Sequence, residues 1–153
     1  MSSLQVDSIA AIGGGHVDGT GLVVQFKEAV YTTSTTIADG VTDTITTLNF
    51  TPKFSDSLIL CQGFHSRDST VSASSFGISR IYAGVTAVSI ANSVGYKLNE
   101  SNDARFQYGY SGSISSWGTT SLAIDLDLSA ADGSWTVSRN SKKTSLLVWE
   151  IAQ

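Results

Sequence analysis

Hydrophobic and polar residues alternate along most of this chain, which is typical of half-buried β-strands. The clearest case runs from Leu122 to Leu128, where leucine and isoleucine on one face alternate with Asp125 and Asp127 on the other. Similar runs begin at Leu22 and are separated by turns rich in glycine, serine and aspartate. The pattern predicts an all-β fold of eight or nine short strands, an antiparallel β-sandwich of jelly-roll type.

The stretch from Val41 to His65 is predicted to form the central strand pair of this sandwich. Its first half, ending at Phe50, alternates threonines with apolar residues, and the only proline, Pro52, begins a polar connection. From Leu58 onward the residues on both faces are mostly apolar. We therefore expect both faces of this second strand to be covered.

The final strand, Leu146–Ala152, is apolar on nearly both faces. Such a strand belongs in the centre of a sheet or beneath a partner chain, because an exposed apolar edge promotes aggregation. Leu147, Trp149 and Ile151 are therefore candidate oligomer-interface residues.

Residues 1–21 differ from the rest and are predicted to form an extended, glycine-rich arm, with the sandwich domain over residues 22–153. A segment so rich in glycine loses much entropy when it is ordered, and it rarely holds itself in place. We expect it to be pinned against another protein rather than packed on its own domain. The candidate anchoring residues are its sizeable apolar side chains before the run of three glycines: Leu4, Val6, Ile9 and Ile12.

Several short strings, in this order, carry a resemblance to a known family. They are the opening Leu4–Ile9 arm, the strand Gly21–Phe26, the Thr51-Pro52 turn, the strand Ser57–Leu60 and the closing Glu150-Ile151-Ala152. In this layout the chain resembles short structural proteins of tailed bacteriophages, particularly marine and cyanobacterial ones, which are labelled as fibre or decoration proteins. The resemblance implies a virion structural protein with a β-sandwich body, commonly a homotrimer.

Composition and charge exclude several functions. The net charge is −4, and the basic residues are scattered, so we expect no nucleic-acid or anionic-membrane binding. No apolar run approaches the roughly 20 residues that span a bilayer, and the N-terminus lacks the features of a signal peptide. The single cysteine, Cys61, cannot form an intrachain disulfide. Folding in the reducing cytoplasm of a host cell, followed by incorporation into a virion, is the simplest expectation.

The residues that could carry chemistry do not assemble into a known pattern. The segment Gly13–Gly19 fits neither the dinucleotide fingerprint nor the Walker loop. Cys61 and His65 share a strand face but would lie roughly 13 Å apart along it. We therefore expect Cys61 to be a plain buried thiol, and we expect no catalytic residue, no cofactor and no metal.

Two polar or aromatic features leave alternatives open. Asp125 and Asp127 could bind calcium, above all where three such faces meet on a trimer axis, although a solvated strand face explains their spacing. Trp117 is a possible exposed binding contact for a host glycan, together with the polar stretches Ser66–Ser75 and Asn92–Asp103, which are predicted to be exposed loops.

These features together favour a non-enzymatic virion protein: a trimeric capsid decoration or cement protein, held by its arm on the major capsid protein or another virion protein. The chain is short and has no shaft repeat, which favours decoration over a tail fibre. The alternative function is a tail-fibre, receptor-binding or glycan-binding module.

Overall fold

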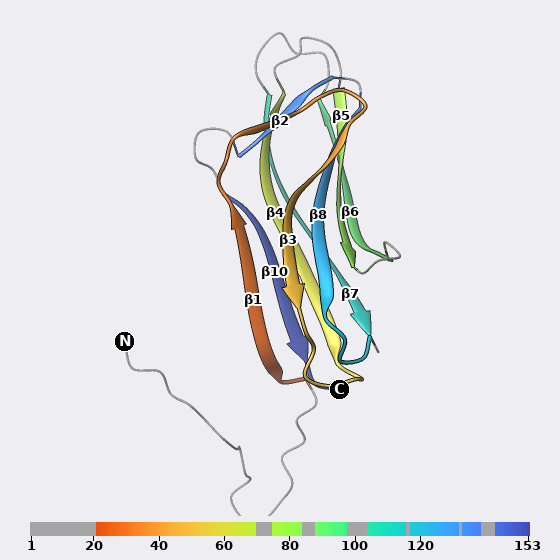
Figure 1. Ribbon diagram of the computed structural model, residues 1–153. Helices are drawn as coiled ribbons and strands as arrows, with labels where there is room; N and C mark the ends of the chain where they lie inside the picture. Colours follow the sequence, from red (N-terminus) through yellow and green to blue (C-terminus); the bar gives the residue numbers. More distant parts are fainter. Residues whose placement is uncertain are drawn as a thin grey trace, which may run out of the picture.

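The computed structural model describes residues 21–69, 75–83, 88–97, 104–115, 117–131, 133–138 and 143–153. Their regular secondary structure consists of β-strands (Figure 1). In chain order these are β1 (Val23–Tyr31), β2 (Thr35–Ile37), β3 (Thr42–Phe50), β4 (Leu58–Ser69), β5 (Ser75–Ala83), β6 (Val88–Lys97), β7 (Ala104–Ser115), β8 (Leu122–Ala131), β9 (Trp135–Val137) and β10 (Thr144–Ile151). Within the described part of the chain, no helix is long and apolar enough to cross a membrane.

The strands form two antiparallel sheets that pack face to face. Sheet A has the order β1-β10-β4-β7, with the short strands β9 and β2 continuing beside the far end of β4, and sheet B has the order β3-β8-β5-β6. If the eight long strands are numbered along the chain, the sheets read 1-8-3-6 and 2-7-4-5. The first strand therefore neighbours the last, and the second the seventh. This nested order is a jelly roll and confirms the predicted fold class.

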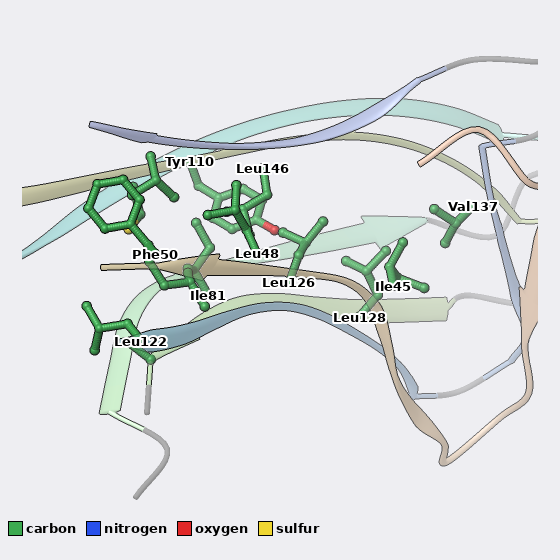
Figure 2. Close-up of a cluster of buried hydrophobic side chains, with 14 of the residues drawn as sticks. Ile45, Leu48, Phe50, Ile81, Tyr110, Leu122, Leu126, Leu128, Val137 and Leu146 are labelled. Atoms are coloured by element: carbon green, nitrogen blue, oxygen red, sulfur yellow. The ribbon is translucent and has the colours of Figure 1, made fainter. Parts of the chain in front are cut away.

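The hydrophobic core fills the space between the two sheets. Figure 2 shows Tyr110 and Leu146 from sheet A pointing towards Leu48, Ile81 and Leu126 from sheet B. The alternation along β8 places every second residue in this core, as the sequence predicts. Full burial of each such leucine or isoleucine contributes about 1.5–3 kcal/mol of stability.

The predicted central pair is wrong in one respect, because β3 and β4 lie in different sheets. β3 is an edge strand of sheet B, whereas β4 lies inside sheet A between β10 and β7. The connection Thr51–Ser57, with Pro52 buried, carries the chain from one sheet to the other instead of reversing it within a sheet. The apolar faces of both strands line the core but oppose other strands: β3 lies across from β1 and β10, and β4 lies across from β5 and β6.

The predicted polar loops begin too early in the sequence. β4 continues to Ser69, and β6 continues to Lys97, so only residues 70–74 and 98–103 of the two stretches lie outside the described residues. Backbone pairing explains the difference, because Ser66–Ser69 pair with β7 and Asn92–Lys97 pair with β5. Strand hydrogen bonds continue where side chains are polar, and the side-chain pattern does not report where they end.

Glycines allow three close approaches around β7. Tyr110 lies over Gly63, and Phe64 lies over Gly109, in each case across a directly paired position. Gly112 instead faces backbone, because a Cβ atom there would lie 2.0 Å from the carbonyl oxygen of Ile90 in β6. The edges of the two sheets can approach this closely only when position 112 has no side chain.

Gly112 faces backbone whereas Gly109 faces a side chain, and this difference gives a test of the packing between β6 and β7. Gly112→Ala should lower the free energy of unfolding by about 1–3 kcal/mol, because the new methyl group meets a backbone carbonyl that cannot move alone. Gly109→Ala should cost clearly less, since the exposed ring of Phe64 can rotate away. Urea denaturation of both variants measures the difference, and equal losses would contradict this account.

Candidate interaction surface

One buried carboxylate organises the end of the sandwich where the described chain begins and ends. The side chain of Glu150 is fully buried. Its Oε1 accepts hydrogen bonds from the backbone N–H groups of Lys53 (2.8 Å) and Phe54 (2.9 Å) and from Ser57 Oγ (2.6 Å). Its Oε2 accepts a hydrogen bond from Gln25 Nε2 at 2.6 Å. Glu150 thus holds the connection between the sheets against the first strand.

The environment of Glu150 favours its charged form. Burial by itself raises the pKa of this carboxyl, but the hydrogen bonds from Ser57, Lys53, Phe54 and Gln25 outweigh burial, and the pKa lies below its usual value. Both carboxylate oxygens are thus bound by local donors. The carboxylate is therefore a structural group rather than a general acid or base.

Asp125 and Asp127 lie on the outer face of sheet B, as the sequence predicts. Asp125 accepts a hydrogen bond from Thr47 Oγ1 (2.6 Å), and Asp127 accepts one from Thr44 Oγ1 (2.7 Å). Partial burial raises the pKa of Asp127, and the charge of Asp125 adds to this rise, while Thr44 and Arg80 oppose it. Among the described residues, no three His, Cys, Asp or Glu side chains come together in a group that could hold a metal ion.

Cys61, His65 and Ser79 lie inside the core. His65 Nε2 and Ser79 Oγ are 3.0 Å apart and connect β4 to β5, and the ring of Tyr110 packs edge-on against His65. Burial raises the pKa of Cys61 to about 12, so this residue remains an unreactive thiol near neutral pH. None of the three side chains is more than 1% exposed, so a substrate has no access to them.

The outer face of sheet A differs from all of these polar clusters because it is largely apolar. The strand register arranges its side chains in four rows across β1, β10, β4 and β7, which we call the outer grid. The rows are Val23, Ile151, Leu58 and Ser115; Phe26, Trp149, Leu60 and Ser113; Glu28, Leu147, Gln62 and Ser111; and Val30, Ser145, Phe64 and Gly109.

No described part of the chain covers the outer grid. Val23 is 57% exposed, Phe26 48%, Val30 45% and Phe64 40%. The rings of Phe26 and Trp149 pack against each other, with centroids 5.3 Å apart, and form the centre of its apolar half. Exposed apolar side chains that gather on one face in this way mark an interaction surface.

The three predicted interface residues, Leu147, Trp149 and Ile151, all lie in this grid, on the partly exposed face of β10. β10 itself lies inside sheet A, between β1 and β4, as its two apolar faces predict. The sequence prediction missed Phe26 and Leu60, which flank Trp149 on either side. The signal for Leu60 was the apolar second face of its strand, which we expected to be covered.

The other predicted contact residues have mixed outcomes. Trp117 is half-buried and packs against the core, while Gly118 beside it donates a hydrogen bond to the carbonyl of Ser55. Its role as a binding contact stays a prediction. The anchoring residues Leu4, Val6, Ile9 and Ile12 lie outside the described residues.

Comparison with known proteins adds little to this geometry. No protein-family model and no curated protein matches the sequence. Among solved structures, the protein is similar to a chain in the structure of infectious bursal disease virus Gt strain, with a TM-score of 0.49 and 12% identity over 100% of this chain. It is also similar to a D431N mutant VP2 protein of the same virus, with a TM-score of 0.48 and 13% identity over 99% of this chain. The chain spans 42% and 40% of those two chains.

The buried carboxylate gives a stability prediction. Glu150→Gln should lower the free energy of unfolding by about 2–4 kcal/mol at neutral pH, because an amide loses the charge-assisted bonds and turns an N–H group towards a donor. The matched control is Asp56→Asn, an exposed carboxylate in the same connection, which should change stability by less than about 0.5 kcal/mol. Urea denaturation of both variants measures the two losses, and similar losses would contradict the structural role of Glu150.

The same pair of proteins gives a pH dependence with a definite sign. The pKa of Glu150 is lower in the folded protein than its ordinary value of 4.5, so its charge stabilises the fold fully above that pH. This contribution is lost as the pH falls through the lower, folded value. The stability gap between the wild type and Glu150→Gln should therefore narrow only in acid. A gap that is constant down to the acid-unfolding limit would contradict the role assigned to the carboxylate.

Proposed function

We propose that this chain is a non-enzymatic structural protein of a virus particle, specifically a bacteriophage capsid decoration or cement protein. The observation that carries the proposal is the outer grid of the jelly roll, which no described residue covers. Jelly rolls serve as viral capsid proteins, lectins and cupins, so the fold alone does not choose among them. The reactive side chains described above are buried or hydrogen-bonded within the domain, whereas the outer grid is accessible and largely apolar, which suits protein–protein contact.

Copies of the chain associate through the outer grid, with Leu147, Trp149 and Ile151 at its centre. The resemblance to short phage structural proteins implies a homotrimer, while an apolar face by itself suits more than one symmetry. Association of many copies on a particle stabilises it by mass action, because burial across subunit boundaries favours the assembled state without any chemistry. This is the mechanism of a cement protein.

The arm, residues 1–21, anchors the domain on the major capsid protein or another virion protein. Gly21 N donates a hydrogen bond to Ala152 O (2.7 Å), and Ala152 N donates one to Leu22 O (2.9 Å). These bonds fix the start of the described chain beside the first row of the grid, between Val23 and Ile151. The arm therefore enters the domain at the end of sheet A where the apolar side chains are most concentrated.

The location and copy number of the protein in purified particles test this proposal. Quantitative mass spectrometry and labelled-antibody electron microscopy should find many copies distributed over the head. Deletion of residues 1–20 should abolish binding to particles while the domain remains folded, since Gly21 and its bond to Ala152 are retained. A few copies confined to the tail, or absence from the particle, would overturn the decoration role.

The alternative, a receptor-binding or glycan-binding module, is favoured by one observation, the partly exposed Trp117 in the connection between β7 and β8. In that case Trp117→Ala should abolish saturable binding to host polysaccharide. If the protein is a decoration protein, the same change should only lower stability, by about 1–3 kcal/mol, because the ring also packs on the core. Glycan arrays and thermal melts of one variant distinguish the two outcomes.

A further inference from the structure

The outer grid has an uneven distribution of side-chain size. Its first column, on β1, carries Val23, Phe26, Glu28 and Val30, whereas its last column, on β7, carries only Ser115, Ser113, Ser111 and Gly109. The two columns lie at opposite edges of sheet A (Figure 1). A bulky edge and a small edge on one face are complementary in shape, provided that a second copy brings its small edge over the first copy's bulky edge.

Two rows of the central columns, on β10 and β4, also combine side chains of different size. In the second row Trp149 on β10 neighbours Leu60 on β4, and in the fourth row the small Ser145 neighbours Phe64. If two copies stack so that β10 of one lies over β4 of the other, Phe64 of each copy meets Ser145 of the other. Trp149 of each copy then meets Leu60 of the other. Large side chains again face smaller ones.

We propose that the outer grid binds the outer grid of a second copy of this chain, around a two-fold axis that runs parallel to the strands between β10 and β4. This inference deepens the proposed function by naming what binds to the grid. It rests on the proposed function only in taking the grid to be a contact surface. In the resulting dimer, Phe26 of each copy lies over Ser113 of the other. With the strands of the two copies aligned, Val30 of each copy lies over Gly109 and the ring of Phe64, which covers that glycine.

The other two-fold axis in the plane of the sheet gives a poor fit. An axis perpendicular to the strands would place β1 over β1 and β7 over β7, with the order of the rows reversed. Phe26 of one copy would then face Glu28 of the other, which buries a carboxylate against an aromatic ring. Ser113 would face Ser111, which leaves a gap between the two small columns. Only the axis parallel to the strands pairs the bulky residues of β1 with the small residues of β7.

Charge is also consistent with the parallel axis. Glu28 is the only charged residue of the sixteen in the grid. Across this axis it lies over Ser111 of the second copy, whose hydroxyl can donate a hydrogen bond to it. The two Glu28 side chains lie on opposite edges of the dimer, roughly 14 Å apart, so they repel each other only weakly.

The size of the grid suits a stable dimer. Four strands and four rows measure roughly 19 by 27 Å, about 500 Å² in projection, and the accessible area is larger because side chains stand out from the sheet. Specific dimers bury about 800 Å² per partner. Aligned sheets cross at about 30°, which displaces the edge columns by roughly 4 Å, less than the spacing of about 7 Å between rows. The pairs of the two middle rows, Phe26 over Ser113 among them, therefore keep their partners. The outermost rows lie about 10 Å from the centre and shift sideways by about 5 Å, one strand spacing, so their partners change column.

The parallel axis also places both arms on one side of the dimer. A rotation around an axis parallel to the strands leaves the ends of the strands where they are, so Gly21 of both copies lies at the same end. Two arms can then reach one surface together, which raises their combined affinity through effective concentration. A three-fold arrangement would instead pair the grid with a different surface, because contacts around a three-fold axis are heterologous.

A size swap between facing positions tests the proposal. Analytical ultracentrifugation of the full chain should show a dimer. Ser113→Phe should weaken it at least about tenfold in Kd, because two aromatic rings then compete for one site, and Phe26→Ser should also weaken it. The double variant should restore the dimer, since the phenylalanine introduced on β7 again faces a serine on β1 of the other copy. Thr42→Phe, at an exposed position on the edge strand of sheet B, is the matched control and should leave the Kd unchanged.

A disulfide test reports the geometry directly. Phe26 and Ser113 lie three strand spacings apart in one chain, roughly 14 Å, which is too far for an intrachain disulfide. Oxidised Phe26→Cys/Ser113→Cys protein should therefore run as a covalent dimer on a non-reducing gel. Phe26→Cys alone should not cross-link, because the two copies of β1 lie on opposite edges. The buried Cys61 takes no part.

Each outcome decides the inference. A monomer at tens of micromolar protein, a trimer, a covalent ladder or a size swap that fails to restore association would overturn it. Thermal melts must show that the single variants remain folded, which is expected because both positions are exposed. A dimer that is absent from virus particles would leave this inference intact and overturn the proposed function. Abundant protein on particles that is monomeric or trimeric in solution would support the proposed function and overturn the inference of a dimer.

Discussion

A two-layer sandwich can cover only one face of each of its sheets, and this constraint decides which surfaces of the molecule are free for function. Sheet B meets the constraint with polar residues: Asp125 and Asp127 point outward, and Thr47 and Thr44 bind them. Sheet A does not, because Phe26 and its neighbours are apolar on the face that the core cannot reach. The difference between the two outer faces is the strongest functional signal in the structure, since the fold needs no apolar side chains there.

The open edge of the sandwich shows that polar groups here serve the fold. β1 and β3 are the edge strands of different sheets, and side chains rather than a strand ladder connect them. Gln25 Nε2 donates to Thr51 O (2.7 Å), and Lys27 Nζ donates to Asn49 O (3.0 Å). With the buried Glu150 behind them, these bonds satisfy backbone carbonyls that would otherwise offer β3 as a template for another strand. Association through the flat face of sheet A is thus favoured over association through this edge.

The sequence predicts this fold well where the information is local. Alternation places the strands, and the parity along β8 gives the outward direction of Asp125 and Asp127. Strand pairing is not local, so the sequence alone could not show that β3 and β4 belong to different sheets. Glu150 was missed because a glutamate in an apolar strand looks like an ordinary surface residue. Its position in the alternation marks it as buried, because Glu150 lies on the same face of β10 as Leu146 and Val148, which face the core.

The symmetry of association depends on the strand register, which cannot be read from the amino-acid composition. Leu147, Trp149 and Ile151 identify an interface, but an apolar strand is equally suited to a dimer, a trimer or a contact with another protein. The register adds the missing information, because it states which side chains of four distant segments share a row. Once the rows are known, bulky residues on β1 and small residues on β7 restrict the arrangements that bury the face without gaps. Packing of this kind supports the proposed two-fold axis parallel to the strands, because interiors and specific interfaces are filled to similar density.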